Sequence, residues 1–89
     1  SLRVFPNPFN PVGRIEFESP GSGPIMLEIF DVCGRRVRTF AMEGFAGARA
    51  GALVWDGKDD SGRAVASGNY LWRLQSSGQS TSMKMQWVR

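Results

Sequence analysis

Short stretches in which apolar and polar residues alternate recur along the whole chain. Alternation with a period of two is typical of a β-strand that buries one face. The clearest case is residues 25–30, where Ile25, Leu27 and Ile29 share an apolar face opposite a mixed one, so this strand is expected near the centre of a sheet. The pattern predicts strands at residues 2–5, 14–18, 25–30, 36–41, 53–56, 69–75 and 81–88.

The segment between the fourth and fifth of these strands, residues 42–52, is rich in alanine, which would suit a helix. Gly44, Gly47 and Gly51 recur within it, and each glycine costs a helix about 1 kcal/mol relative to alanine. We therefore predict a loop here.

Strands this short and this closely spaced, in a chain of 89 residues, predict an all-β fold. The expected architecture is one domain over residues 1–89, a seven-stranded antiparallel immunoglobulin-like β-sandwich. It must form without a disulfide, because Cys33 is the only cysteine. The core is expected to depend on Trp55, Tyr70 and Trp72, and a buried Tyr70 hydroxyl would need a backbone carbonyl in the preceding loop as its partner.

The formal charge of +3 comes mainly from arginines spread along the chain and interleaved with acidic residues. Nucleic-acid binding is not expected, because it requires a concentrated basic face. In the densest basic run, alternation places Arg36 and Arg38 on one solvent-facing side of a strand. No apolar run approaches the roughly 18 residues of a membrane-spanning helix, so no membrane span is expected.

The chain contains no histidine and only one cysteine, which removes the usual zinc sites and all histidine-based catalytic triads. Cys33 falls in a predicted turn without a histidine to activate it, and is interpreted as a plain small side chain. We expect neither an enzyme nor a cofactor.

Three carboxylates lie close together in "WDGKDDSG", at Asp56, Asp59 and Asp60. A calcium loop would place oxygen ligands on alternate residues and end in a glutamate, but Lys58 interrupts the spacing and no glutamate follows. The favoured interpretation is a rigid connector in which the aspartates accept hydrogen bonds from nearby backbone N–H groups. Gly57, Gly62 and Gly68 are expected to adopt conformations that other residues avoid, and a weak cation site at residues 56–60 is the alternative.

Four stretches, "FPNPFNP", "LEIFDVCGRRVRTF", "VWDGKDDSGRAVASGNYLWRL" and "MKMQWVR", resemble the C-terminal sorting domains of type IX secretion cargo. They are equally similar to the related immunoglobulin-like domain of the flagellar hook-capping protein. The match covers nearly the whole chain in order. It departs from the usual pattern at Cys33, where an apolar residue is common, and in the alanine-rich "FAGARAGA" segment.

The resemblance implies a non-catalytic module at the end of a longer secreted protein, exported through the periplasm to the cell surface or medium. Its partners would be a translocon or shuttle protein and the upstream domains of the same chain. Independently of the resemblance, we expect the module itself to be a monomer. The ending of the chain right after its last predicted strand favours this role. The family's signature positions correspond here to Pro6, Asn7, Pro8, Asp31, Gly34, Arg35, Trp55, Asp56, Gly57, Gly68, Tyr70 and Lys84.

The last predicted strand carries the candidate recognition surface. Lys84, Gln86 and Val88 point outward on it, while the residues between them face the core. If this strand lies at a sheet edge, its free backbone groups could pair with a receptor strand, with Lys84 favouring the right partner. The alternative is that Lys84 only guards the edge against aggregation. Two alternatives are a structural module of the hook-cap type and a carbohydrate-binding accessory module, for which Phe30 and Phe45 are the candidate platform aromatics.

Overall fold

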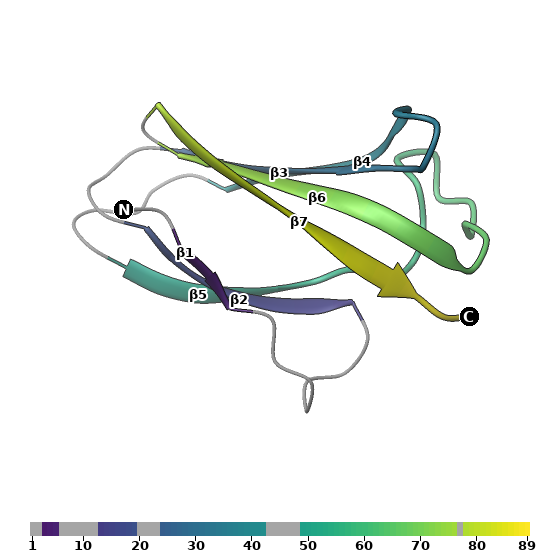
Figure 1. Ribbon diagram of the computed structural model, residues 1–89, viewed down its shortest axis with the longest axis horizontal. Coiled ribbons are helices and arrows are strands. Elements are labelled where there is room, and N and C mark those ends of the chain that lie inside the picture. Colours follow the sequence, from purple (N-terminus) through teal and green to yellow (C-terminus); the bar gives the residue numbers. More distant parts are fainter. Residues whose placement is uncertain (1–2, 6–12, 20–23, 43–48, 77) are drawn as a thin grey trace.

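The computed structural model describes residues 3–5, 13–19, 24–42, 49–76 and 78–89, which form two antiparallel sheets and no helix. The first sheet has the order β1 (Arg3–Phe5), β2 (Arg14–Ser19) and β5 (Arg49–Val54). The second has the order β4 (Arg36–Met42), β3 (Ile25–Phe30), β6 (Gly68–Ser76) and β7 (Gln79–Trp87). Figure 1 shows the sheets as two layers, so the predicted all-β, antiparallel and sandwich-like character is confirmed.

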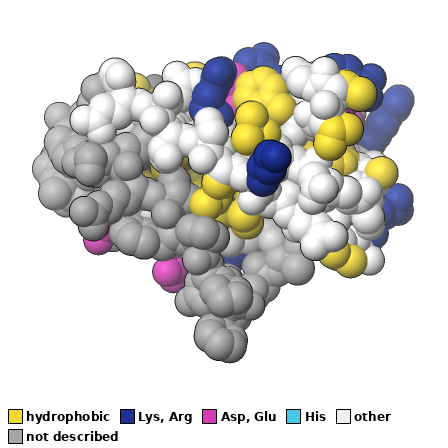
Figure 2. Space-filling view, in the orientation of Figure 1, with side chains coloured by type: hydrophobic (Ala, Val, Ile, Leu, Met, Phe, Trp, Pro, Cys, Tyr) yellow, Lys and Arg dark blue, Asp and Glu magenta, His cyan; other side chains and the backbone are white. Residues whose placement is uncertain are grey.

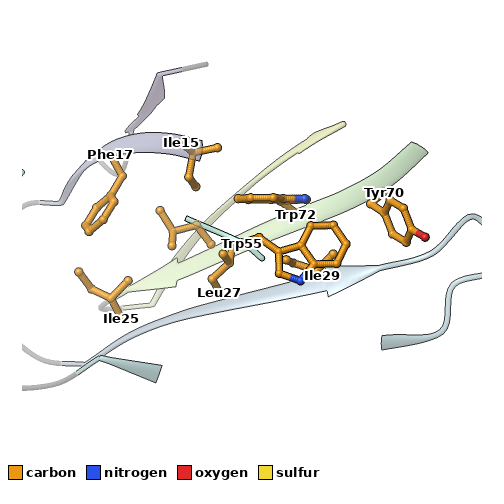
Figure 3. Close-up of a cluster of buried hydrophobic side chains, with 9 residues drawn as sticks. Ile15, Phe17, Ile25, Leu27, Ile29, Trp55, Tyr70 and Trp72 are labelled. Atoms are coloured by element: carbon orange, nitrogen blue, oxygen red, sulfur yellow. The ribbon is translucent and has the colours of Figure 1, made fainter. Parts of the chain in front are cut away.

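The core lies between the two layers (Figure 3). As predicted, β3 is a central strand, paired with β4 on one side and β6 on the other. Alternate residues of a strand point to the same side of the sheet, and those of β3 that face the core are fully buried. The buried apolar side chains are Ile15 and Phe17 from β2, Ile25, Leu27 and Ile29 from β3, Tyr70, Trp72 and Leu74 from β6, and Trp55.

Trp55 is the centre of an aromatic cluster. Its ring centroid lies 5.2 Å from that of Tyr70 and 6.0 Å from that of Trp72, both in edge-to-face geometry. Such pairs add about 0.5–1.5 kcal/mol each beyond the area they bury. The Tyr70 hydroxyl donates to the carbonyl of Ala66 at 2.6 Å, which confirms the predicted partner in the preceding loop. Burial raises the pKa of this hydroxyl above its usual value, which favours the protonated form that donates this hydrogen bond.

The prediction of a loop at residues 42–52 is wrong for the part that the structure describes. β4 extends to Met42, and β5 begins at Arg49 and pairs with β2 along its whole length. Gly51 stands opposite Phe17, and a Cβ at Gly51 would lie 2.9 Å from the Phe17 ring. The small residue therefore makes room for an aromatic ring within a strand, instead of marking a turn. Residues 43–48 lie outside the described part of the chain.

The predicted shared side for Arg36 and Arg38 is also wrong, because the β3–β4 register shifts between Ile29 and Phe30. Arg38 pairs with Ile29, whose side chain faces the core, whereas Arg36 pairs with Phe30 on the outer face. An extra residue in one strand exchanges, for all residues beyond it, the side chains that face the core with those that face solvent. The bulge therefore turns the two arginines to opposite faces of the sheet.

Candidate functional site

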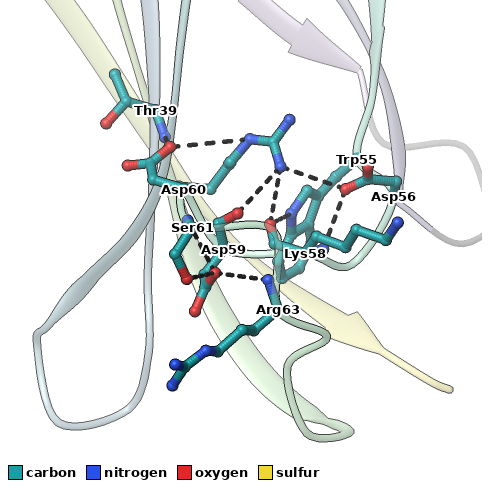
Figure 4. Close-up of polar contacts among 9 residues, drawn as sticks. Thr39, Trp55, Asp56, Lys58, Asp59, Asp60, Ser61 and Arg63 are labelled. Carbon is teal, nitrogen blue, oxygen red and sulfur yellow. Dashed lines mark hydrogen bonds and ion pairs between the residues drawn. The ribbon is translucent and has the colours of Figure 1, made fainter.

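The aspartate-rich loop between β5 and β6 is held by its own side chains (Figure 4). Asp56 Oδ1 accepts the backbone N–H of Lys58 at 3.0 Å. Asp59 Oδ1 accepts the backbone N–H groups of Ser61 and Arg63, each at 3.0 Å, and the Ser61 hydroxyl at 2.7 Å. These bonds favour the ionised carboxylate, and the Ser61 hydroxyl above all lowers the pKa of Asp59. The predicted turn role is confirmed for Asp56 and Asp59, whereas Asp60 accepts from the distant Thr39 N–H.

The glycines of this loop differ from one another. Gly57 and Gly62 have φ angles of 76° and 89°, the left-handed conformation that was predicted for them. Gly68 was expected to share it, but it is the first residue of β6 and pairs with Trp87 in ordinary strand register. Nothing lies within 4 Å of where its Cβ would be, so no close contact requires a glycine at this position.

A guanidinium group lies among the oxygen atoms of the loop. Arg38 Nη1 donates to the carbonyl of Lys58 at 3.0 Å, and lies 3.4 Å from both Asp56 Oδ1 and the carbonyl of Asp59. Arg38 Nε lies 3.9 Å from Asp60 Oδ1. The bulge in β4 directs Arg38 to this position, which the sequence pattern did not reveal. The arginine supplies the positive charge that a bound cation would otherwise provide to these oxygens.

We expect millimolar calcium to shift the melting temperature of the protein by less than about 1 °C, because a ligand raises it only by binding the native state. Within the described residues, no group of three or more acidic, cysteine or histidine side chains is arranged to hold a metal ion. Thermal unfolding followed by circular dichroism, with magnesium at the same ionic strength as control, measures the shift. A rise of several degrees in calcium alone would contradict the expectation.

The same loop covers one edge of the four-stranded sheet. The N–H of Asp60 donates to the carbonyl of Val37 at 2.9 Å, and the N–H of Thr39 donates to Asp60 Oδ1 at 3.0 Å. Asp60 thus satisfies backbone groups of β4 that a further strand would otherwise use. Covering an edge in this way prevents unwanted strand pairing. The carboxylate cluster is a structural connector and an edge cover.

The opposite edge of this sheet is β7, which pairs with β6, and no other strand in the described part of the chain pairs with it. The predicted outward residues Lys84 and Gln86 are both exposed on β7. Val88, expected in the same row, follows the end of the strand at Trp87 and is 56% exposed. The structure therefore places Lys84 and Gln86 together on a strand surface and Val88 beyond it.

Trp87 anchors the end of β7 to the rest of the fold. Its ring centroid lies 5.1 Å from that of Trp55, and the ring packs where Gly13 and Gly57 carry no side chain. Glycine is needed at both positions because a Cβ there would overlap the indole ring. Sequence alternation indicated that Trp87 faces the core, but not that two glycines receive it.

The outer face of the four-stranded sheet contains an ionic network that the sequence analysis missed. Glu28, which is only 5% exposed, accepts from Arg73 Nη2 at 2.7 Å, Gln75 Nε2 at 2.8 Å and Arg36 Nη1 at 3.2 Å. The hydrogen bond from Arg73 is the main reason that the pKa of Glu28 lies below its usual value, although burial opposes the shift. A glutamate on the outer face of a predicted central strand was the available signal, since a buried carboxylate requires partners.

Three of the signature positions form the tight connection between β3 and β4. Asp31 Oδ1 accepts the backbone N–H groups of Cys33 at 2.9 Å and Arg35 at 3.0 Å, and the backbone bond from Arg35 is the main cause of a lowered Asp31 pKa. Gly34 has a φ of 83°, a left-handed conformation that favours glycine, and Cys33 is exposed. Pro6, Asn7 and Pro8 lie outside the described residues.

Comparison with known proteins adds no relative: no family model, no curated protein and no solved structure matches this chain. The resemblance to sorting domains and hook-cap domains therefore stays a prediction. No helix long and apolar enough to cross a membrane occurs in the described residues.

Proposed function

We propose that this chain is a non-catalytic recognition module, of the kind found at the end of type IX secretion cargo, and that a protein partner reads it at β7. The observation that carries the proposal is the difference between the two edges of the four-stranded sheet. The aspartate loop bonds to the backbone of β4 at Val37 and Thr39, whereas β7 has no partner strand on its outer side within the described residues. An available edge strand is a common site for adding a strand from another chain.

Strand order supports an immunoglobulin-like fold. In immunoglobulin constant domains, strands A, B and E share one sheet and strands C, F and G the other. Here the first, second and fifth strands share one sheet, and the third, sixth and seventh share the other, which β4 joins beside β3. Sandwiches of this kind present their loops at two ends and their outer strand faces to solvent. A recognition role needs no more than such a stable surface.

Lys84 is proposed to give the contact at β7 its charge preference. Its side chain is on the outer face of the strand, directly opposite Leu71 of β6, and no carboxylate of the described residues lies within 4.0 Å of its ammonium group. A charged group at the rim of an interface acts mainly on partner choice and association rate. A carbohydrate platform is less well supported, because the Arg73 guanidinium lies over the Phe30 ring at 5.2 Å and Phe45 is outside the described residues.

The test is export of a reporter fused to this domain in a bacterium that has a type IX system. We expect the wild-type domain to bring the reporter to the surface or medium, and Lys84→Glu to lower this about tenfold, the effect of losing about 1.4 kcal/mol of partner affinity. Arg63→Glu is the matched control, since it makes the same charge change at an exposed loop residue.

Circular dichroism must show both variants folded before export is compared. Truncation from residue 85 is a poorer test because it removes Trp87 from the core. Equal export of both variants, or failure of the wild-type fusion to leave the cell, would contradict the proposal.

A further inference from the structure

One row of residues crosses all four strands of the second sheet on its outer face. Register pairs Arg36 with Phe30, Phe30 with Leu71, and Leu71 with Lys84. Directly opposite residues in an antiparallel sheet have neighbouring side chains on the same face. The row therefore places two adjacent apolar side chains between two cations.

A hollow lies over the apolar part of this row. Its walls include Phe30, Val32, Leu71, Arg73 and Lys84. Val32 is 81% exposed and Leu71 39% exposed, so both present apolar surface to the hollow. Figure 2, which views the sandwich from the side that carries β7, shows hydrophobic and basic side chains interspersed there, with few acidic ones among them. The hollow thus offers an apolar floor with positive charge at its border.

A ligand that approaches this face meets a net positive charge. Arg36 and Arg73 share the single carboxylate of Glu28, whose side chain is 6% exposed, whereas their own side chains are 56% and 42% exposed. A partner therefore meets the guanidinium groups and not the carboxylate below them, and Lys84 adds a further positive charge. Asp31 also borders the hollow, but Arg35 neutralises it through a contact of 3.0 Å.

We propose that this outer face binds an extended acidic segment of a protein partner, in which an apolar residue stands midway between two carboxylates. The inference rests on the proposed function for the existence of a protein partner, and it names that partner's chemistry. The apolar side chain enters the hollow between Phe30 and Leu71. One carboxylate meets Lys84, and the other meets the Arg36 and Arg73 guanidinium groups.

The dimensions of the sheet set the spacing of the segment. Neighbouring strands lie about 4.8 Å apart, so the row from β4 to β7 spans about 14 Å. An extended chain rises about 3.3 Å per residue and turns alternate side chains to the same side, so positions i, i+2 and i+4 span about 13 Å on one face. The expected pattern is an acid, any residue, an apolar residue, any residue and an acid. The segment crosses the strands and leaves the β7 edge open for backbone pairing.

The experiment is fluorescence anisotropy with labelled, end-blocked peptides at low ionic strength. The probe contains Glu-Ser-Leu-Ser-Glu. One comparison peptide has lysine in place of both glutamates, and another has the same composition with the glutamates adjacent. We expect the probe to bind about tenfold more tightly than the rearranged peptide, the lysine peptide not to bind, and salt to weaken binding.

Variants of the protein locate the contact. Lys84→Glu and Leu71→Thr should each weaken probe binding about tenfold, while Arg63→Glu, with the same charge change as Lys84→Glu, leaves it unchanged. Loss of affinity in Lys84→Glu no greater than in Arg63→Glu would overturn the proposal. So would equal affinity for all three peptides, tighter binding of a neutral oligosaccharide or an oligonucleotide, or a dimer in sedimentation that buries this face.

Peptide binding and export can fail separately. Normal, Lys84-dependent export without probe binding would overturn this inference and leave the proposed function standing. Probe binding without export of the wild-type fusion would support the acidic-segment site and overturn the sorting role.

Discussion

Replacing Trp55 with alanine should lower the free energy of unfolding by about 3–5 kcal/mol, which threatens a domain whose total stability is about 5–15 kcal/mol. Trp55 is 2% exposed and contacts the rings of Tyr70, Trp72 and Trp87, so the substitution opens a cavity that several large side chains border. It also removes the hydrogen bond from Trp55 Nε1 to the carbonyl of Lys58, at 2.8 Å. Urea denaturation followed by circular dichroism measures the loss.

Substitutions at the two residues next to Trp55 show whether core packing or the hydrogen bonds of the turn contribute more to stability here. Asp56→Ala removes the bond to the Lys58 N–H and the contact with Arg38, and should cost about 1–2 kcal/mol. Val54→Ala, at a side chain in β5 that is 59% exposed, should change stability by less than about 0.5 kcal/mol. A larger loss for Asp56→Ala than for Trp55→Ala would reverse the ranking of core over turn.

Replacing Gly57 with alanine should cost about 2–5 kcal/mol, although it adds a single methyl group. The φ of 76° is a left-handed conformation that costs other residues about 1–2 kcal/mol. The new Cβ would also overlap the Trp87 ring and lie 2.7 Å from its Nε1, and overpacking of this kind costs about 1–3 kcal/mol. The same denaturation measurement tests the value.

Gly62→Ala is the control that separates the two causes. Gly62 has a similar φ of 89°, but nothing lies within 4 Å of its Cβ position. Alanine there should cost only about 1–2 kcal/mol, from the backbone alone. Equal losses for the two alanine variants would show that the contact of Gly57 with Trp87 contributes nothing to stability.

The parts of the fold that the sequence predicted well are those governed by alternation. β3 matches its expected bounds, and Tyr70, Trp72 and Leu74 of β6 are buried as the period of two required. Lys84 and Gln86 lie outward on β7 for the same reason. Each of these features depends on residues close together in the chain, so a local pattern contains the necessary information.

The features that escaped prediction depend on contacts between distant residues. In the sequence alone Gly51 suggests a turn, because nothing there shows that Phe17 lies opposite it on another strand. Arg38 reads as an outward residue until the bulge in β4 turns it to the aspartate loop, 18 positions further along the chain. Glu28 and Arg73 are 45 positions apart and meet only because β3 pairs with β6. Local propensity cannot reveal such tertiary contacts.

The covering of β4 by Asp60 has a consequence for stoichiometry. A sheet with two available edges could accept a strand on each side and join copies of the domain into an open chain. Here the Asp60 contacts with Val37 and Thr39 close one side, which leaves β7 as the place for an added strand. The four-stranded sheet can then accept one such strand, so strand addition to this sheet ends at one partner, or at a pair of domains joined through β7.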